Sequence, residues 1–557
     1  MTSHRSTRRA ATRAAGALLL SLAAAAGPAG AQQPPAPPAG GGAGEQGRAV
    51  RQRTLYDDLQ LFSGVLNQIR VNHADSIDPH VLVMAAIRGM VQAADPYSGV
   101  VAGTRLSPEK EKLLREGKLY PVGIDFEFRG DWTGAAPVVR SVTPGSSASK
   151  EDILPGDELI AIDSQPVLAE NVNELDITLR GPKRSKVKLT FARTRADGSR
   201  ASLTREVKRE ALDEGTGVPV ATMLDPQTGY VRVTTFDNTN VAEDLHKAVG
   251  QLEDRGMKRL ILDIRGNGGG YVREASQIAG EFLPKGAIVY TVDARKAEVR
   301  KDTGRVDRSF FSREKRYPMI VMVDEGSASA SELVAGALQD HDRALLVGRP
   351  SHGKALEMTT MPIMDGASTW SYIYLNIGRV KTPCGRIIQR PFRGMTRREY
   401  FRRAGAVVDT AGRPSCRTTS GRTVYGGGGV YPDVFLPDQT TPLWLVRANE
   451  ASLPLRWVGL HLQAKGASYT SLDALVANPT LAPADLAEFR KLASGEGITI
   501  PAGAAEDALL QRTLLGWIAD AKWGGEGRYR VDAVLDPEVK MGLAAFDRAA
   551  AILVSAK

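Results

Sequence analysis

The stretch DEGSASASELVAGALQDHDRALLVGRPSHGK, residues 324–354, decides the fold of this chain. It follows an apolar run at 319–323, which has the length and β-branched content of a buried strand. Apolar residues then recur at the spacing of one helix face, and Ser329 and Glu332 have the spacing of a capping box. A second apolar run at 344–347 leads into a loop that ends in a lysine. The pattern predicts a strand, a sharp turn, a helix and a second strand.

This arrangement places the Ser329 hydroxyl where a strand meets a helix N-terminus, which is a suitable position for a nucleophile. The backbone N–H of Ala330 is then free to donate to a developing oxyanion, helped by the helix dipole. Lys354 can act as a base only if burial lowers its pKa from about 10.4, because an ammonium accepts no proton. The simpler interpretation is a helix N-cap without chemistry.

GSASASE at 326–332, with Lys354 placed 25 positions after Ser329, resembles the C-terminal processing peptidases, which are Ser/Lys serine proteases that carry a PDZ domain. The resemblance covers nearly all of the chain that follows the N-terminal segment. It implies that Ser329 is the nucleophile and that Lys354 is its general base.

LDIRGNGGG at 262–270 places a glycine-rich loop after a predicted strand. It lacks the lysine of a phosphate-binding loop and the glycine spacing of a dinucleotide site. The segment resembles the LDLRNNPGG motif of the same family, with Gly266 in place of the first asparagine and Gly268 in place of the proline. By position, the resemblance implies that Gly269 or Gly270 supplies the second oxyanion donor.

A β-rich segment that contains LPGDELIAID, at 154–163, resembles a PDZ domain. Such a domain captures a peptide C-terminus as an added strand, and the resemblance implies that Val122, Gly123 and Ile124 receive the terminal carboxylate. Pro121 removes one donor from that loop, so a mere spacer is the alternative.

The expected fold is an α/β protease core with an inserted β-rich PDZ domain and helical N- and C-terminal regions. We expect a signal peptide at 1–31, a Pro/Gly linker at 32–50, an N-terminal helical region at 51–115, the PDZ domain at 116–210, the protease core at 211–440 with an arginine-rich insertion at 386–422, and a C-terminal helical region at 441–557.

The N-terminal segment has the three parts of a secretory signal: four arginines, a short apolar core at 16–26 and a small-residue cleavage site at 29–31. The core is about half the roughly 20 residues that span a bilayer. We therefore expect an exported, periplasmic protein without a stable membrane span after cleavage, and an uncleaved anchor is the alternative. Farther on, DPYS at 95–98 is interpreted as a helix stop.

The net charge of +9 is concentrated in two places. Four of the positive charges belong to the signal segment, and the insertion at 386–422 carries ten arginines against two acidic residues. The remainder is slightly acidic, which argues against a nucleic-acid partner. The insertion is predicted to be a solvated arginine-rich loop.

Cys384 and Cys416 are the only cysteines. In an oxidising compartment two such thiols tend to pair, so we expect a disulfide that closes the insertion. Met358 stands where the family usually has a glutamine or glutamate that orients the lysine. Glu357 is one residue early and replaces it only if a bulge shifts the strand register.

The seven histidines show no metal-ligand spacing, so no metal or other cofactor is expected. His341 lies about 18 Å from Ser329 along the predicted helix, whereas His352 is the nearest rival base. The leading hypothesis is an exported endopeptidase that recognises C-terminal tails of protein substrates, with or without an adaptor. The alternatives are an inactive PDZ adaptor of the same fold and an acyl-transfer or hydratase enzyme.

Overall fold

The computed structural model describes most of the chain from residue 53 onward. The predicted signal peptide and linker lie outside the described residues. These are 53–101, 108–129, 136–143, 145–167, 172–195, 199–212, 216–237, 240–294, 303–307, 314–364, 370–402, 409–438 and 440–555.

A six-stranded sheet forms the centre of the α/β core, and most of its neighbouring strands are parallel. Only the edge pair β8–β9 is antiparallel. In sheet order the strands are β19 (Val434–Phe435), β14 (Leu345–Gly348), β13 (Met319–Val323), β10 (Arg259–Asp263), β9 (Thr228–Arg232) and β8 (Val220–Asp225).

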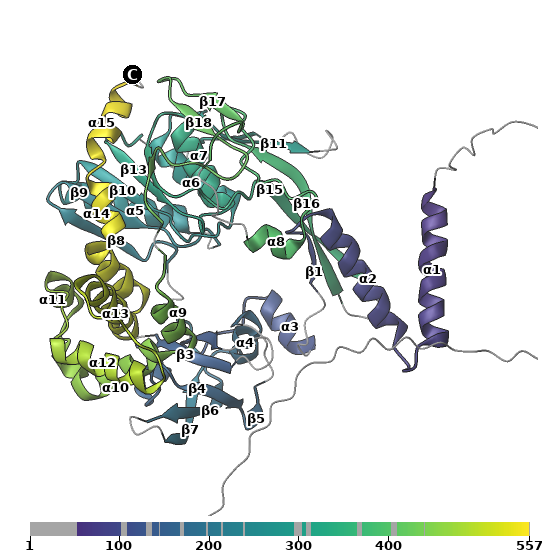
Figure 1. The fold of residues 1–557 in the computed structure, drawn as a ribbon, viewed down its shortest axis with the longest axis horizontal. Helices are drawn as coiled ribbons and strands as arrows, with labels where there is room; N and C mark the ends of the chain where they lie inside the picture. Colours follow the sequence, from purple (N-terminus) through teal and green to yellow (C-terminus); the bar gives the residue numbers. More distant parts are fainter. Residues whose placement is uncertain are drawn as a thin grey trace, which may run out of the picture. The chain divides into compact units, whose positions relative to one another are not determined.

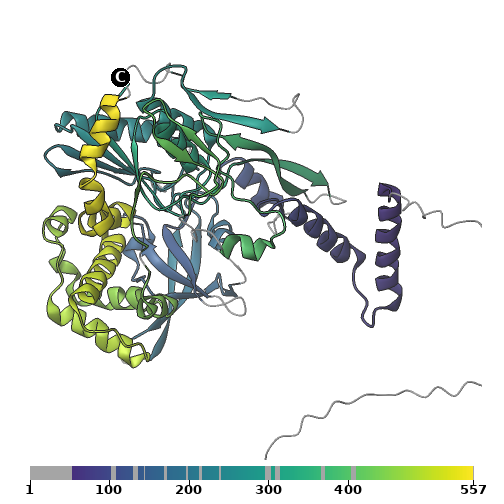
Figure 2. The same ribbon diagram turned by 45° about the horizontal axis from the view of Figure 1, so that its top comes forward.

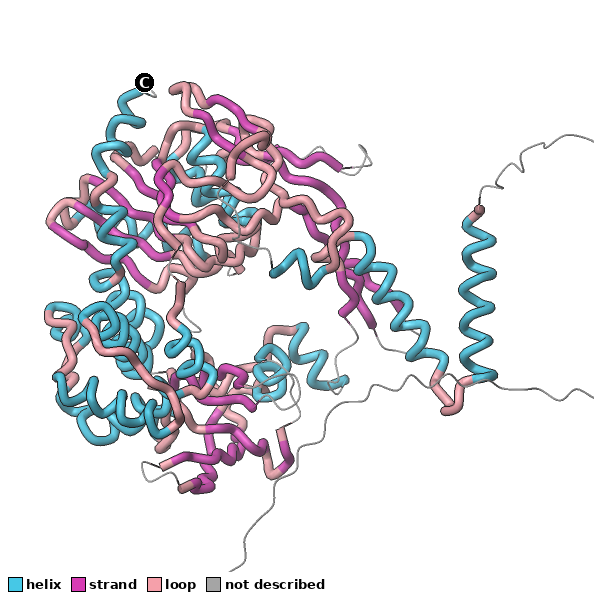
Figure 3. The backbone as a smooth tube through the Cα atoms, in the orientation of Figure 1, coloured by secondary structure: helices cyan, strands magenta, loops and turns pink. Residues whose placement is uncertain are grey.

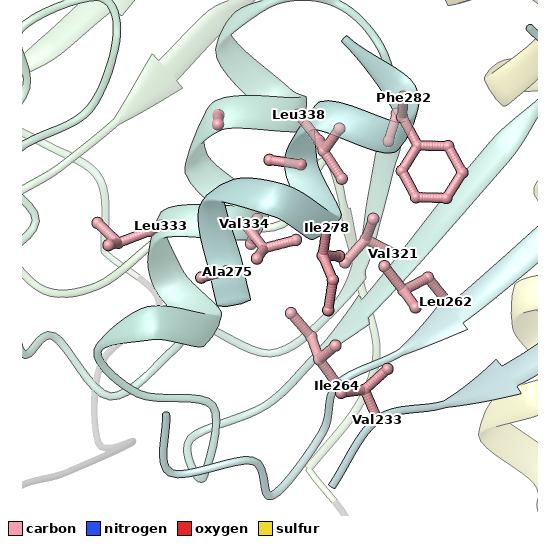
Figure 4. Close-up of a cluster of buried hydrophobic side chains, with 14 of the residues drawn as sticks. Val233, Leu262, Ile264, Ala275, Ile278, Phe282, Val321, Leu333, Val334 and Leu338 are labelled. Atoms are coloured by element: carbon pink, nitrogen blue, oxygen red, sulfur yellow. The ribbon is translucent and has the colours of Figure 1, made fainter. Parts of the chain in front are cut away.

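The central strands are apolar throughout because both faces of this sheet are buried. One face packs on α5 (Val241–Asp254), α6 (Val272–Phe282) and α7 (Ala330–Asp340). Figure 4 shows side chains of α6 and α7 beside those of the central strands. The other face packs on α14 (Pro537–Leu543) and α15 (Phe546–Ser555), which lie beside β10 and β13 in Figure 1. The end of the predicted C-terminal helical region is therefore part of the α/β core.

A second, antiparallel sheet lies beside this core. Its longest pair is β15 (Leu356–Met364) with β16 (Trp370–Lys381), the extended hairpin visible in Figure 2. The register of this pair shifts between Glu357 and Met358, so the bulge considered from the sequence is present. The other strands are β1 (Gly99–Val101), β11 (Ile288–Ala294) and β12 (Thr303–Arg305).

The PDZ-like module is a six-stranded antiparallel sheet with its own apolar cluster. Its helix α4 (Val172–Leu179) contacts the first strand, and a short 3-10 helix occupies Ala148–Lys150. The strands are β2 (Ile124–Arg129), β3 (Ala136–Val142), β4 (Glu158–Ile162), β5 (Gln165–Pro166), β6 (Lys186–Thr194) and β7 (Arg200–Lys208).

The C-terminal region before α14 and α15 is also helical. Figure 3 shows its helices as cyan segments joined by loops. Its helices share a separate apolar cluster. The longest of them is broken at Gly524, whose φ of 67° is not helical. They are α9 (Leu443–Glu450), α10 (Leu453–Lys465), α11 (Leu472–Ala477), α12 (Pro483–Gly495) and α13 (Ala504–Leu535), with a 3-10 turn at Gly466–Ser468.

At the N-terminal end, α1 (Leu55–Asn72) belongs to a unit of its own and buries none of its residues. The described part of the region predicted to be helical also contains α2 (Pro79–Ala94) and α3 (Pro108–Arg115). Among the described residues, each helix is too short or too polar to cross a membrane.

Candidate active site

Ser329 lies at the sharp turn between β13 and α7, as predicted. Its backbone has φ 56° and ψ −114°, which is strained for a residue with a side chain and costs about 1–3 kcal/mol. The Asp324 carboxylate holds the turn, since it accepts hydrogen bonds from the N–H groups of Gly266 (2.7 Å), Gly326 (3.0 Å) and Ser327 (3.1 Å). Strain that is held in place at a strand–helix junction is typical of an exposed nucleophile.

The glycine-rich loop packs directly against this turn. Asn267 is fully buried, and its carbonyl accepts hydrogen bonds from the N–H of Ala328 (2.9 Å) and the hydroxyl of Ser331 (2.7 Å). Gly269 has a φ of 105°, and a Cβ at this position would lie 2.8 Å from the Cβ of Ser329. Only glycine fits here, so the loop brings its backbone up to the serine.

The backbone N–H groups of Ala330 and Gly270 have no acceptor among the residues that the structure describes. The N–H of Gly269, by contrast, donates to the side-chain oxygen of Asn267 at 2.9 Å. Of the two glycines implied by the family motif, Gly270 therefore has the N–H that can still bind an oxyanion.

Lys354 ends the loop that follows β14, beside the serine turn. This loop is tied to the turn by a hydrogen bond from the N–H of His352 to the carbonyl of Ser327, 2.9 Å long. Burial lowers the pKa of Lys354, and the negative charges of Glu332 and two aspartates oppose that shift. A lowered pKa is what the lysine needs in order to accept a proton.

Glu332 joins the serine and the lysine through one fully buried carboxylate. One of its oxygens accepts the N–H of Ser329 (2.9 Å) and the N–H of Lys354 (2.8 Å). The other accepts the N–H of Gly353 (2.7 Å) and the hydroxyl of Ser351 (2.5 Å). Burial raises the pKa of Glu332 to about 7, against the effect of these hydrogen bonds. The sequence indicated a capping residue here, whereas the structure adds the link to the lysine loop.

Tyr97 of the DPYS segment reaches the same site, so the interpretation of this segment as only a helix stop is wrong. The Asp95 carboxylate shapes the turn by accepting the N–H groups of Tyr97 (2.8 Å) and Ser98 (2.7 Å). The ring of Tyr97 lies 5.1 Å from Nζ of Lys354, and its hydroxyl is 3.0 Å from Nε2 of His352. An aromatic face at this distance attracts an ammonium and limits where the lysine head can move.

The rival base His352 contacts the hydroxyl of Tyr97. Among the residues that the structure describes, it makes no hydrogen bond with Ser329. Burial, followed by the charge of Arg390, lowers the pKa of His352. The bulge at Glu357 meets the condition under which that residue could turn to the face expected of Met358. The carboxylates that act on the pKa of Lys354 are nevertheless Glu332, Asp237 and Asp95.

Part of the arginine-rich insertion packs against the core, which corrects the expectation of a wholly solvated loop, whereas Arg393 and Arg417 are exposed. Cys384 and Cys416 form the predicted disulfide. Arg386 is 3% exposed and is paired with the buried Asp340. Arg422 bonds to Asp342 (2.8 Å) and Asp433 (3.0 Å). Buried arginines are tolerated because carboxylates of the core neutralise them, a partnership that a charge count does not reveal.

The three residues expected to bind a peptide C-terminus lie at the start of β2. Gly123 adopts a φ of 76°, and Val122 is buried. A cavity of about 460 Å³ opens at this loop. Ile124 lines it with Arg180 of the α4 segment and with the broken part of α13, Trp523–Glu526. The guanidinium of Arg180 is paired with Asp176 of the same cavity at 2.7 Å, and the sequence had not indicated this residue.

Comparison with known proteins identifies two parts of this architecture. Residues 227–396 match peptidase family S41, and residues 138–193 match the PDZ domain. The chain carries an S41 peptidase domain and a PDZ domain. The resemblance to the C-terminal processing peptidases is confirmed, and so is the fold class predicted from the sequence.

Similar curated proteins share these parts. They include carboxyl-terminal-processing peptidase 2, chloroplastic, of Arabidopsis thaliana (32% identical over 54% of this chain and 56% of the relative), and the carboxy-terminal processing protease CtpA of Bacillus subtilis (31%, 54% and 61%). The carboxy-terminal-processing protease of Bartonella bacilliformis is 28% identical over 61% of this chain and 74% of its own length. The matched segment thus spans little more than half of the first relative.

Solved structures give a weaker likeness. The photosystem II D1 C-terminal processing protease aligns with 71% of this chain and 90% of its own, at 23% identity and a TM-score of 0.35.

Proposed function

We propose that this protein is an exported serine endopeptidase that recognises C-terminal tails through its PDZ domain and cleaves by Ser/Lys acyl-enzyme chemistry. The observation that carries the proposal is the buried Glu332 carboxylate, which binds the backbone N–H groups of Ser329 and Lys354 with a single oxygen. It sets a strained serine beside a lysine whose pKa is lowered by burial.

In the proposed reaction, the neutral amine of Lys354 takes the proton of the Ser329 hydroxyl while the oxygen attacks the scissile carbonyl. The N–H groups of Ala330 and Gly270 stabilise the negative charge that develops on the carbonyl oxygen. The lysine then gives its proton to the leaving amine, so the peptide bond breaks and an acyl ester forms on Ser329. A water molecule, deprotonated by the same lysine, hydrolyses the ester and restores the serine.

The PDZ domain would hold the substrate while this chemistry proceeds. A tail added as a strand at β2 would place its carboxylate at Val122, Gly123 and Ile124, beside Arg180. Cleavage should then depend on the last residues of the substrate. The same arrangement would serve protein substrates delivered by an adaptor.

Incubation of the protein with unfolded chains that differ only at the C-terminus, with products identified by mass spectrometry, tests the proposal. Ser329→Ala and Lys354→Ala should each abolish cleavage, whereas Ser494→Ala, at an exposed serine of α12, should cleave like the wild type. His352→Ala should retain part of the activity. If His352→Ala is inactive while Lys354→Ala cleaves, the assignment of the base is wrong. Tail binding without any cleavage by the wild type would favour the PDZ adaptor.

A further inference from the structure

The disulfide-closed insertion also contacts the lysine loop. Here α8 (Arg397–Arg402) carries Tyr400, whose side chain is 1% exposed. Its hydroxyl lies 2.9 Å from the hydroxyl of Tyr97 and donates to the carbonyl of Gly353 at 3.4 Å. One buried tyrosine of the insertion therefore touches both the aromatic neighbour of Lys354 and the residue that precedes it.

The insertion also holds the residue that follows the lysine. The side-chain oxygen of Gln389 accepts the N–H of Ala355 at 2.9 Å, while its amide nitrogen donates to the Tyr400 hydroxyl at 2.9 Å. The N–H of Arg390 donates to the carbonyl of Gly353 at 3.0 Å. Both chain neighbours of Lys354 are thus hydrogen bonded to the insertion, and the N–H of Lys354 itself is bound by Glu332.

Aromatic rings pack around Tyr97. Together with the hydrogen bonds of Tyr400 and Gln389, they form a wall beside Lys354. The ring of Tyr97 meets the rings of Tyr400 and Phe401 edge-on, with centroids 5.6 and 5.5 Å apart. The guanidinium of Arg390 lies 4.2 Å from the ring centre of Tyr400. Because these rings are close-packed, the face of Tyr97 that covers Lys354 cannot shift without moving the insertion.

We propose that the insertion closed by Cys384–Cys416 positions the base of the protease: Tyr400 and Gln389 fix the backbone on both sides of Lys354 and hold Tyr97 over its amine. The inference rests on the proposed Ser/Lys function. In this chain, the insertion takes the place of the glutamine or glutamate that position 358 lacks. Tyr400, Gln389 and Tyr97 are positioning residues, because they act through the lysine and not on the substrate.

The groups around Lys354 indicate how its pKa, and with it the pH–rate profile, would change if these contacts were lost. The charged and titratable groups around it come from several elements, and they are Glu332 on α7, Asp237 after β9, Asp95 and Tyr97 after α2, His352 on its own loop and Arg390 on the insertion. Burial is the main cause of its lowered pKa. Water admitted at Tyr400 would raise the pKa of Lys354 and move the acidic limb of the pH–rate profile to higher pH.

Peptide cleavage by purified variants, with kcat and KM measured across pH, tests this inference. Tyr400→Phe keeps the ring but loses the hydroxyl contacts, so kcat should fall about tenfold with KM unchanged, since a displaced base costs orientation. Tyr400→Ala should lower kcat about a hundredfold and shift the acidic limb upward by about one pH unit. Tyr425→Phe is the matched control, because the Tyr425 ring packs on Tyr431, away from the lysine.

The disulfide gives an independent arm. The double variant Cys384→Ser, Cys416→Ser, with folding checked by circular dichroism, should show the lowered kcat and shifted limb of Tyr400→Ala. Thiol reduction should bring the wild type to the same values and leave the double variant unchanged. If Tyr400→Phe, Tyr400→Ala and the double variant all keep the wild-type kcat and pH profile, the inference is overturned. If the wild type shows no cleavage that Ser329→Ala abolishes, the proposed function is overturned instead.

Discussion

Replacing Glu332 by glutamine should change how the stability of this protein depends on pH. The carboxylate is fully buried and accepts four hydrogen bonds, two on each oxygen. A glutamine amide has one acceptor oxygen, which can keep the N–H groups of Ser329 and Lys354. Its NH2 group can donate to the hydroxyl of Ser351 but leaves the N–H of Gly353 unpaired. One buried unpaired N–H costs about 1–3 kcal/mol.

The sign of the pH effect follows from the pKa of Glu332, which burial raises to about 7. A carboxyl with a raised pKa contributes stability that is complete below its unfolded pKa and is lost as the pH rises through the folded value. Between about pH 5.5 and pH 8.5 this group should therefore remove about 2 kcal/mol of the unfolding free energy of the wild type. The glutamine variant has no such titration, so its deficit should shrink by that amount.

Urea unfolding at the two pH values measures both numbers. Glu332→Gln should be less stable than the wild type by about 1–3 kcal/mol near pH 5.5 and close to it near pH 8.5. Glu109→Gln, at an exposed glutamate of α3, should show no change in its difference from the wild type. A deficit of Glu332→Gln that stays constant across pH would refute the reasoning.

Two further outcomes follow from the contacts. Gly269→Ala should lose activity and stability, since its Cβ would lie 2.8 Å from that of Ser329 at a φ of 105°. Gly268→Ala has open space for its Cβ and should stay active. Cleavage rates and thermal unfolding compare the two variants. Asp263→Asn should lower the unfolding free energy by about 3–5 kcal/mol near pH 7 in urea titrations, because Arg232 would lose the carboxylate that it is paired with and Arg265 would keep only Asp536 and Glu538. Both guanidiniums lower the pKa of Asp263 against the effect of burial. An unchanged unfolding midpoint would contradict this prediction.

The serine turn could be predicted because all of its signals are local. The apolar run of β13, the small residues and the helix spacing lie within one segment of the sequence. The disulfide could be predicted because the two cysteines had no other partner. Both predictions needed only neighbouring residues or a residue type that occurs twice.

The contacts of Lys354 could not be predicted in the same way. Tyr97 and Tyr400 are 303 positions apart, and tertiary packing alone brings their hydroxyls to 2.9 Å. The buried state of Arg386 depends on Asp340, 46 positions away, so its charge suggested solvent. A charge pattern or a turn motif does not identify such partners, because patterns in a single sequence report only local preferences.

The Cys384–Cys416 bond has a consequence for the life of a newly made chain. A copy that is still in a reducing compartment would already have its serine turn, which depends on backbone contacts within the core. Lys354 would be less firmly positioned, because the insertion that holds it would not yet be closed by the disulfide. Under the proposed export and the proposed role of the insertion, oxidation of these two cysteines would raise the activity of the enzyme only after the chain has left the compartment in which it is made.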